Sequence, residues 1–476
     1  MKKKFRLWLN IVTICLCICA IAIGVYAATS ATLTVQGQIG FTAHGCDIDA
    51  SGYVYGHAAG TTVDEMKVGL PTVAPTAQDG SDKVWLDDGD NSTTGSANVA
   101  KLRNDNNNTA SLDIGDRYFT DMNGDVTGKP TDIVVVLTLT NQSLFDVYGV
   151  VSATSDSDNI GITKSAGLFN LDKKVVNGEE TALDSVEMVI TLSIFPDAAG
   201  NYNSIENLVA DNVHISIDFN KGTIEDKLIK GNATDGYYLE MGTHTYTNAE
   251  SQQVTEPLKW YAFAYKGTAE NATYGSHAKT TALTSGSYYF ISEKALLMTG
   301  QYSGKAFNSK TSYENAEAYK KLEYAYESTI QPLVNGQDDG SVYDTYGMAN
   351  SPIYNAITNR DLVGEEYNYN GNTINPTTQQ PYTTRTAYNQ TLWLLSKAEV
   401  ENPAFFADAN ALKVISVSDA SANSTSYSLW WLRSPEYVGT DGGARSYVVS
   451  VDRVNSEYVN QGVPGVRPGF QLDIAM

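Results

Sequence analysis

The sequence of 476 residues contains only four cysteines, and this scarcity excludes several kinds of site. Cys15, Cys17 and Cys19 lie together in an apolar stretch near the N-terminus, which leaves Cys46 by itself in the rest of the chain. One thiol cannot form an internal disulfide or supply a cysteine-based zinc site. We therefore expect Cys46 to be a small buried residue, with a cross-link between two chains as the alternative.

Histidine is nearly as scarce, and the arrangements typical of catalytic sites are missing. No two of the five histidines have the spacing of metal ligands, and no H-E-x-x-H, G-x-S-x-G or phosphate-loop motif is present. The carboxylates at 338–339 and at 365–366 are adjacent in the chain, so they do not keep the fixed separation of a glycosidase pair. We therefore expect a protein that is not an enzyme and has no catalytic residues.

No cofactor or metal is expected either, although calcium stays open. Oxygen-rich turns occur at 87–91, 104–106 and 121–125, and carboxylate and amide oxygens are calcium ligands. None of these turns has the register of a twelve-residue EF-hand loop. Asp and Asn are also common turn formers, so turn formation is the favoured interpretation.

Basic residues are also few, since 32 Lys and Arg stand against 54 Asp and Glu and give a net charge of −22. Contacts with phosphates need clustered Lys and Arg, so we expect no nucleic-acid partner. A local exception is the start, Met-Lys-Lys-Lys-Phe-Arg, which precedes an apolar run at 7–24 and the small-residue site Val25-Tyr26-Ala27. This pattern predicts a signal peptide, 1–27, and a secreted protein at the extracellular cell surface. An uncleaved membrane anchor is the alternative.

Alternating or β-branched segments dominate the next two hundred residues. They predict strands at 133–140, 147–153, 186–195 and 213–219, and hence a β-sandwich over 28–222. The layout, a signal followed directly by a strand, is similar to the TasA/camelysin family of matrix proteins. The first strand, 28–41, is expected to be a free edge, and a free edge could pair with another subunit in self-assembly.

A change of composition follows a linker expected at 223–236. Of the 30 tyrosines, 24 lie from Tyr237 onward. Capping signals predict helices after 311–314, at Ser351-Pro352, and at Ser396-x-x-Glu399. Because strands also occur in this region, we expect an α+β domain over 237–476 in a mainly β protein. Tyrosines suit both cross-strand packing and ligand contact, and both interpretations stay open.

The last residues contain two motifs, W-W-L-R-S-P at 430–435 and G-V-R-P at 465–468. Together they resemble the signature of an uncharacterised bacterial domain family, which itself looks like the C-type-lectin-like fold of formylglycine-generating enzymes and of variable ligand-binding proteins. The enzymes of that fold work through cysteines, which this region lacks. A structural role is expected for the motif residues Trp430, Trp431, Arg433, Gly465, Arg467 and Pro468.

Between the two motifs, polar and apolar residues alternate from 445 to 459, and a turn or bulge is expected near 455–457. Variable proteins of the lectin-like fold present contact residues on such late strands. The resemblance therefore implies ligand contacts from Tyr437, Arg445, Tyr447, Asp452, Asn455, Tyr458 and Asn460.

These observations predict an exported, non-catalytic protein that binds a protein or glycan outside the cell through a lectin-like C-terminal domain. The alternative is a structural matrix or fibre subunit that assembles through the N-terminal β-sandwich. The sequence does not identify the ligand.

Overall fold

The protein is mainly β. The computed structural model describes residues 33–55, 57–58, 83–86, 99–103, 109–114, 117–119, 132–155, 160–173, 183–194, 211–232, 234, 236–248, 250–269, 272–273, 275–276, 282–296, 341–362, 387–406, 429–436, 445–450, 453–458 and 465–476. The expected signal peptide and the helix expected after 311–314 lie outside these residues. Within them, no helix is long and apolar enough to cross a membrane.

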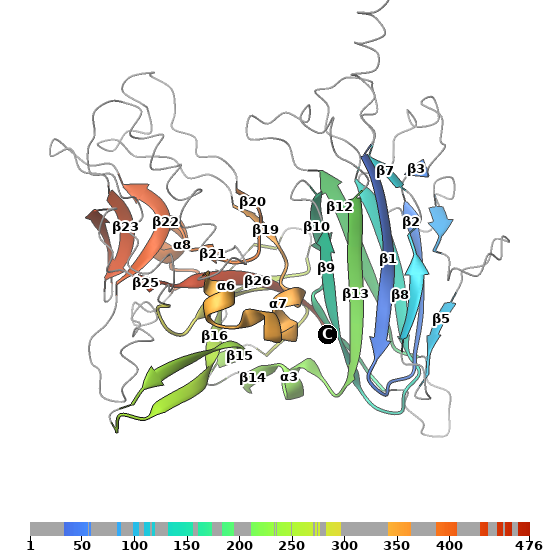
Figure 1. The fold of residues 1–476 in the computed structure, drawn as a ribbon, viewed down its shortest axis with the longest axis horizontal. Helices are drawn as coiled ribbons and strands as arrows, with labels where there is room; N and C mark the ends of the chain where they lie inside the picture. The colour runs from blue at the N-terminus through green and yellow to red at the C-terminus, as the bar shows by residue number, and fades with distance from the viewer. Residues whose placement is uncertain are drawn as a thin grey trace, which may run out of the picture.

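The described N-terminal strands form two layers that share one core (Figure 1). One layer has the order β11-β9-β13-β1-β7-β3, with β6 also on β1, and the other has the order β10-β12-β8-β2-β4, with β5 also on β2. These strands are β1 Leu33–Ala43, β2 Ile48–Tyr55, β3 His57–Ala58, β4 Lys83–Trp85, β5 Val99–Leu102, β6 Thr109–Asp113, β7 Arg117–Phe119, β8 Ile133–Asn141, β9 Val147–Ser155, β10 Ile160–Lys164, β11 Leu168–Leu171, β12 Ser185–Ile194 and β13 Asp211–Lys221.

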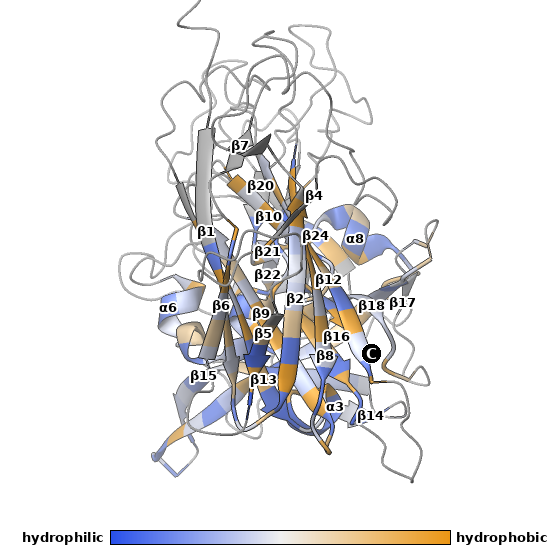
Figure 2. Cartoon of the chain, turned by 90° about the vertical axis from the view of Figure 1, so that its right-hand side faces the viewer, coloured by the Kyte–Doolittle hydropathy of each residue, from blue (hydrophilic) through white to orange (hydrophobic). Residues whose placement is uncertain are grey.

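The core between the layers follows from the alternation of side chains along each strand. On β8 every second residue from Ile133 to Leu139 is fully buried against the opposite layer, where Phe41 and Phe219 stack with ring centroids 6.5 Å apart. Figure 2 shows such hydrophobic positions along the strands of both layers. Cys46 is fully buried in this core, and burial raises the pKa of its thiol to about 11.

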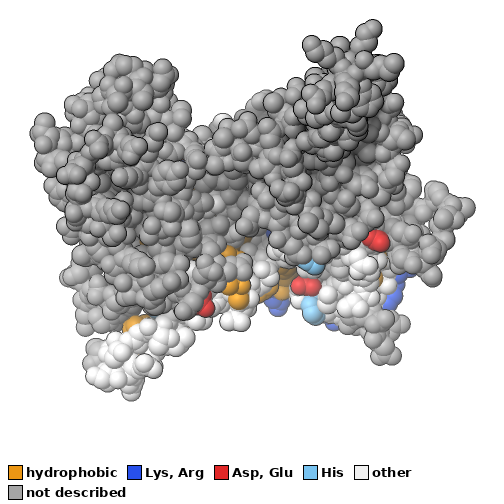
Figure 3. Space-filling view, turned by 45° about the horizontal axis from the view of Figure 1, so that its top comes forward, with side chains coloured by type: hydrophobic (Ala, Val, Ile, Leu, Met, Phe, Trp, Pro, Cys, Tyr) orange, Lys and Arg blue, Asp and Glu red, His pale blue; other side chains and the backbone are white. Residues whose placement is uncertain are grey.

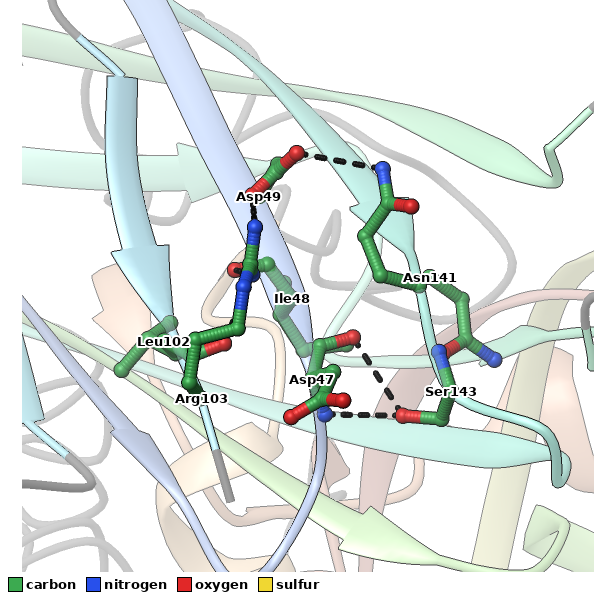
Figure 4. A network of polar contacts seen from close by, with 8 residues as sticks. Asp47, Ile48, Asp49, Leu102, Arg103, Asn141 and Ser143 are labelled. Carbon is green, nitrogen blue, oxygen red and sulfur yellow. Dashed lines mark hydrogen bonds and ion pairs between the residues drawn. The ribbon is translucent and has the colours of Figure 1, made fainter. Parts of the chain in front are cut away.

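Polar contacts tie strand ends together beside this core (Figure 4). Arg103, directly after β5, forms an ion pair of 2.6 Å with Asp49 on β2 and donates to the carbonyls of Ile48 and Leu102 at 3.2 and 2.9 Å. The Ser143 hydroxyl accepts the Asp47 amide at 2.8 Å. The Arg103 bonds hold the end of β5 on β2, and the Ser143 bond fixes the turn after β8 against the start of β2.

Strand β1 corrects the expectation of a free edge. It pairs in parallel with β13 along 35–43, and its other side pairs with β6 and β7. A strand with neighbours on both sides has no backbone groups left for another subunit. The sequence showed the alternation, but it could not show a partner strand almost two hundred residues away.

Several strands of the C-terminal part extend the first of these sheets (Figure 1), while β19 with β20 and β22 to β25 form two further small sheets. The sheet continues from β11 through β26, β18, β16 and β15 to β14, with β21 also on β26 and β17 on β16. The described elements of the C-terminal part are α3 Ile224–Lys227, β14 Ile229–Asn232, β15 Gly236–Thr247, β16 Gln253–Gly267, β17 Gly275–Ser276, β18 Gly286–Ser292, α6 Val342–Thr345, η4 Met348–Asn350, α7 Pro352–Ala356, β19 Arg360–Leu362, β20 Ala387–Gln390, β21 Trp393–Leu394, α8 Lys397–Glu401, β22 Trp430–Glu436, β23 Arg445–Ser450, β24 Arg453–Tyr458, β25 Gly465–Val466 and β26 Pro468–Ala475.

The expected linker at 223–236 is instead built into the fold. Thr223 caps α3 by accepting the Asp226 amide, and Ile224 and Ile229 are buried in the C-terminal core. Strand β14 pairs with β15. The charged residues that indicated a linker lie on the exposed side of these two short elements.

Strand β26 joins the two halves. On one side it pairs with β18, with Phe290 opposite Phe470, and on the other it runs parallel to β11, with Leu168 opposite Ile474. Lys164 is buried at this junction and donates to the carbonyls of Val151 and Asn355 at 2.7 and 2.8 Å. The junction therefore combines strand pairing with hydrogen bonds from a buried amine.

Candidate functional site

The candidate site is built on a separate small sheet with the order β24-β23-β22-β25. Strand β22 carries the W-W-L-R-S-P motif, and it pairs in parallel with β25, where the G-V-R-P motif begins: Trp430 lies opposite Gly465, and Trp431 opposite Val466. The two motifs are therefore neighbours in space. On its other side β22 pairs with β23, and β23 pairs with β24.

Both tryptophans and the second motif arginine anchor this sheet. Trp430 and Trp431 are fully buried, and the guanidinium of Arg467 lies 5.4 Å from the ring centroid of Trp430. Arg467 Nε donates to the Ser292 carbonyl at 2.8 Å. Burial lowers the pKa of Arg467 to about 10, while Glu293 acts in the opposite direction, so the side chain stays charged at neutral pH. These contacts support a structural role for both tryptophans and Arg467.

Arg433 forms an ion pair with Glu399, which the sequence indicated only as part of a capping box. Its Nη1 lies 2.7 Å from Glu399 Oε2 and donates to the Leu394 carbonyl at 2.7 Å. The other oxygen, Glu399 Oε1, lies 2.9 Å from Arg360 Nη1. Burial by itself would raise the pKa of Glu399, but Arg433, Arg360 and the Ser396 amide lower it to about 2.

The same carboxylate completes the capping box expected at the start of α8. Glu399 accepts the Ser396 amide at 2.8 Å, and the Ser396 hydroxyl accepts the Glu399 amide at 2.9 Å. Arg360 also packs on two aromatic rings, with its guanidinium 4.8 Å from the Tyr289 centroid and 5.1 Å from the Trp393 centroid. One glutamate therefore joins β22, the start of α8 and β19. Sequence reasoning missed Arg360, because no local pattern indicates an ion pair across 39 residues.

The expected contact residues separate into three groups. Tyr437, Asp452 and Asn460 lie outside the described residues. Arg445 and Tyr447 are on β23 and Tyr458 is on β24, and the register pairs position 445 with 458 and 447 with 456. Asn455 is exposed on β24.

The register of β23 and β24 corrects two details of the expected pattern. Pairing is continuous from 453 to 458, so there is no bulge near 455–457 between these two strands. Val454 lies opposite the buried Val449 and shares its face, although simple alternation placed these valines on opposite faces. Positions 445, 447 and 458 consequently fall on the face of Val449, and Asn455 falls on the other.

The tyrosines of the C-terminal half divide between packing and surface positions. Tyr288, Tyr289 and Tyr354 are buried in the core, whereas Tyr238 and Tyr261 are half-buried with ring centroids 5.5 Å apart. The Tyr261 hydroxyl donates to Glu293 at 3.4 Å, and burial followed by Glu293 raises the pKa of Tyr261 to about 12. Tyr238 and Tyr261 are opposite each other on β15 and β16, so they pack across the strands.

On the one face that Figure 3 shows, the described charged side chains include both acidic and basic groups and form no extended patch of one sign. Among the residues that the structure describes, no three His, Cys, Asp or Glu side chains are placed to hold one metal ion. The segments considered for calcium, 87–91, 104–106 and 121–125, lie outside the described ranges.

Comparison with known proteins identifies the region that contains this sheet. No curated protein matches the chain. Residues 289–474 match the family described as Domain of unknown function (DUF6273). The matched region begins within β18, ends within β26 and includes both motifs, Glu399 and Arg360. The C-terminal part of the chain thus contains a DUF6273 domain, which places it in an uncharacterised domain family.

Proposed function

We propose that this chain is an exported, non-catalytic protein that binds a protein or glycan outside the cell through the sheet β22–β25. The observation that carries the proposal is the difference between an inner strand of this sheet and its edge strand β24. Strand β22 is fixed by two buried tryptophans and by the Arg433–Glu399 ion pair, whereas β24 is the last strand of the sheet and exposes Asn455. A polar hairpin on a rigid support is a common form of binding surface.

The proposal includes a lectin-like fold for the C-terminal domain and a β-sandwich for the N-terminal layers. The alternation of Tyr, Ser and Asn along β23 and β24 supports contact with a polar ligand, because tyrosine offers a large rigid surface with a polar tip. The structural-subunit alternative has less support, since the strand expected to join subunits already has neighbours on both sides.

The test compares binding and stability in the same variants. Asn455→Ala tests one face of the hairpin, and Tyr447→Ala and Tyr458→Ala test the other; substitution on the binding face should weaken binding to a host-glycan or bacterial-surface array, by about 2 kcal/mol for a central aromatic contact. Thermal unfolding should change little for Asn455→Ala, whose side chain is exposed. Thr163→Ala, an exposed change on β10, is the matched control. Lower stability with unchanged binding in the tyrosine variants would favour the structural-subunit alternative.

A further inference from the structure

A cluster of four polar residues lies on one face of the outer half of the β15–β16 hairpin. His244 is only 4% exposed, and its Nε2 lies 3.1 Å from Lys294 Nζ. Glu256 Oε2 lies 3.8 Å from both of these nitrogens. The Tyr246 hydroxyl donates to Glu256 Oε1 at 2.9 Å, and its ring stacks on the imidazole with centroids 5.5 Å apart. The cluster is therefore closely packed around one buried imidazole.

The bond from Lys294 determines the protonation state of His244. A lysine ammonium group can only donate, so Nε2 accepts and the imidazole proton is on Nδ1. Nδ1 is buried and has no hydrogen-bond partner among the residues that the structure describes. A second proton would place a charge in this buried position and turn Nε2 into a donor facing Lys294. Glu256 offers limited compensation, because it is 3.8 Å away and its side chain is 46% exposed.

Lys294 belongs to a short segment, 292–296, that also holds the candidate binding sheet. The Ser292 carbonyl accepts Arg467 Nε at 2.8 Å. Leu296 exchanges two backbone hydrogen bonds with Val466 on β25, at 2.7 and 2.9 Å. Lys294 thus lies between Ser292, which contacts Arg467, and Leu296, which pairs with Val466 on β25. The side chain of Lys294 contacts the hairpin.

We infer that His244 is a proton-controlled contact between the β15–β16 hairpin and the segment 292–296. With a neutral imidazole, Lys294 is bound and the hairpin is docked on the segment. With a protonated imidazole, Lys294 is repelled and the outer half of the hairpin loosens from the segment that supports β25, while the pairing of Trp260 with Ser292 keeps the inner half in place. Acidification would therefore loosen the support of the sheet β22–β25. The inference does not depend on which ligand that sheet binds.

The direction of the pH effect follows from the groups around His244. Burial lowers its pKa first, Lys294 lowers it further, and Glu256 opposes them. The docked state therefore binds the proton more weakly than the detached state, in which the imidazole has its ordinary pKa of 6.5. The docking contact is at full strength well above pH 6.5, and it weakens as the pH falls below that value.

Hydrogen exchange of the full-length protein tests this contact. We expect backbone amides at 243–257, 292–296 and 465–467 to lose protection between pH 7.5 and pH 5, by up to about tenfold per pH unit, after correction for intrinsic exchange rates. His244→Phe keeps a ring against Tyr246 but cannot titrate, so its protection should not depend on pH. His214→Phe, an exposed change on β13, should keep the wild-type response.

Two further measurements keep the inference falsifiable if His244→Phe does not fold. An NMR titration of the wild-type imidazole should give a midpoint below 6.5, and a midpoint at or above 6.5 would overturn the inference. Lys294→Met should raise that midpoint, because the ammonium group no longer opposes protonation. If His244→Phe folds and still loses protection in acid, another group controls the contact and the inference is wrong.

Discussion

Arg433 and Glu399 form an ion pair of 2.7 Å that joins the W-W-L-R-S-P strand to the start of α8. Their side chains are only 9% and 11% exposed. A charge buried to this extent is stable only if it has a partner, and here Glu399 serves two arginines. The motif arginine is therefore explained by a single carboxylate 34 residues earlier in the chain.

The first prediction concerns this carboxylate. Glu399→Gln should destabilise the protein by about 3–5 kcal/mol, because the buried guanidinium of Arg433 and the partly exposed one of Arg360 lose their counter-charge. Denaturant unfolding measures the change. The matched control is Glu401→Gln, which loses only an exposed pair 3.9 Å from Lys397 and should cost less than about 1 kcal/mol. Equal losses in the two variants would show that the ion pair has no special role.

The same residue predicts a pH dependence. The pKa of Glu399 is depressed from 4.5 to about 2, so its contribution to stability is present above pH 4.5 and is lost as the pH falls towards 2. The difference in unfolding free energy between the wild type and Glu399→Gln should therefore shrink across this window. A difference that stays constant from pH 5 to pH 2 would contradict the assignment.

The third prediction concerns Lys164 at the junction between the halves. Burial lowers its pKa from 10.5 to about 7, with Asp473 acting in the opposite direction. The unfolded chain therefore binds the lysine proton more tightly, and Lys164 makes stability rise with pH between about 7 and 10.5. In Lys164→Met this rise should be smaller in urea unfolding curves. An identical pH profile in the variant would contradict the lowered pKa of the buried Lys164 amine.

The fourth prediction tests how closely the halves pack. A Cβ atom added at Gly167 would lie 1.9 Å from the Ala356 carbonyl oxygen, so the backbone of one half must move. Gly167→Ala should destabilise the protein by roughly 1–3 kcal/mol. At Gly275 an added Cβ would meet nothing within 4 Å, and Gly275→Ala is the control. Unchanged stability in Gly167→Ala would mean that the two halves do not pack as described.

The fifth prediction concerns β26. Deletion of 468–476 removes a strand that pairs with both β18 and β11, and it removes Phe470, Leu472 and Ile474 from the core. We expect hydrogen-exchange protection to fall in both halves, including β9 and β11. Protection that falls only in the C-terminal half would show that the N-terminal layers fold independently of β26.

Strands could be predicted from the sequence where the pattern is local. The ranges expected at 133–140, 147–153, 186–195 and 213–219 correspond to β8, β9, β12 and β13 within a few residues. The capping box at Ser396 is also present as expected. At Ser351 only part of the signal holds, since Pro352 begins α7 but the serine side chain makes no cap. Such features depend on neighbouring residues alone.

Pairing could not be predicted, because it depends on residues that are distant in the sequence. The alternation of β1 is the same for an edge strand and for a central strand, and only β13 and β6 decide between them. For the candidate site, the motifs indicated that Arg433 and Arg467 are structural, but nothing in them indicated Glu399 or the Ser292 carbonyl as partners. The register of β23 with β24 likewise decided which face each residue occupies.

The position of β26 has a consequence for the time course of folding. Asn170, at the end of the N-terminal layers, contacts Met476 across 306 positions of the chain. Contacts of such long range form slowly, because a large loop must close before they contribute. During synthesis, the edge of β11 that pairs with β26 has no partner strand until residue 474 has been added. An unpaired strand edge can pair with other chains, so a chaperone or rapid completion of synthesis would limit aggregation of the nascent chain.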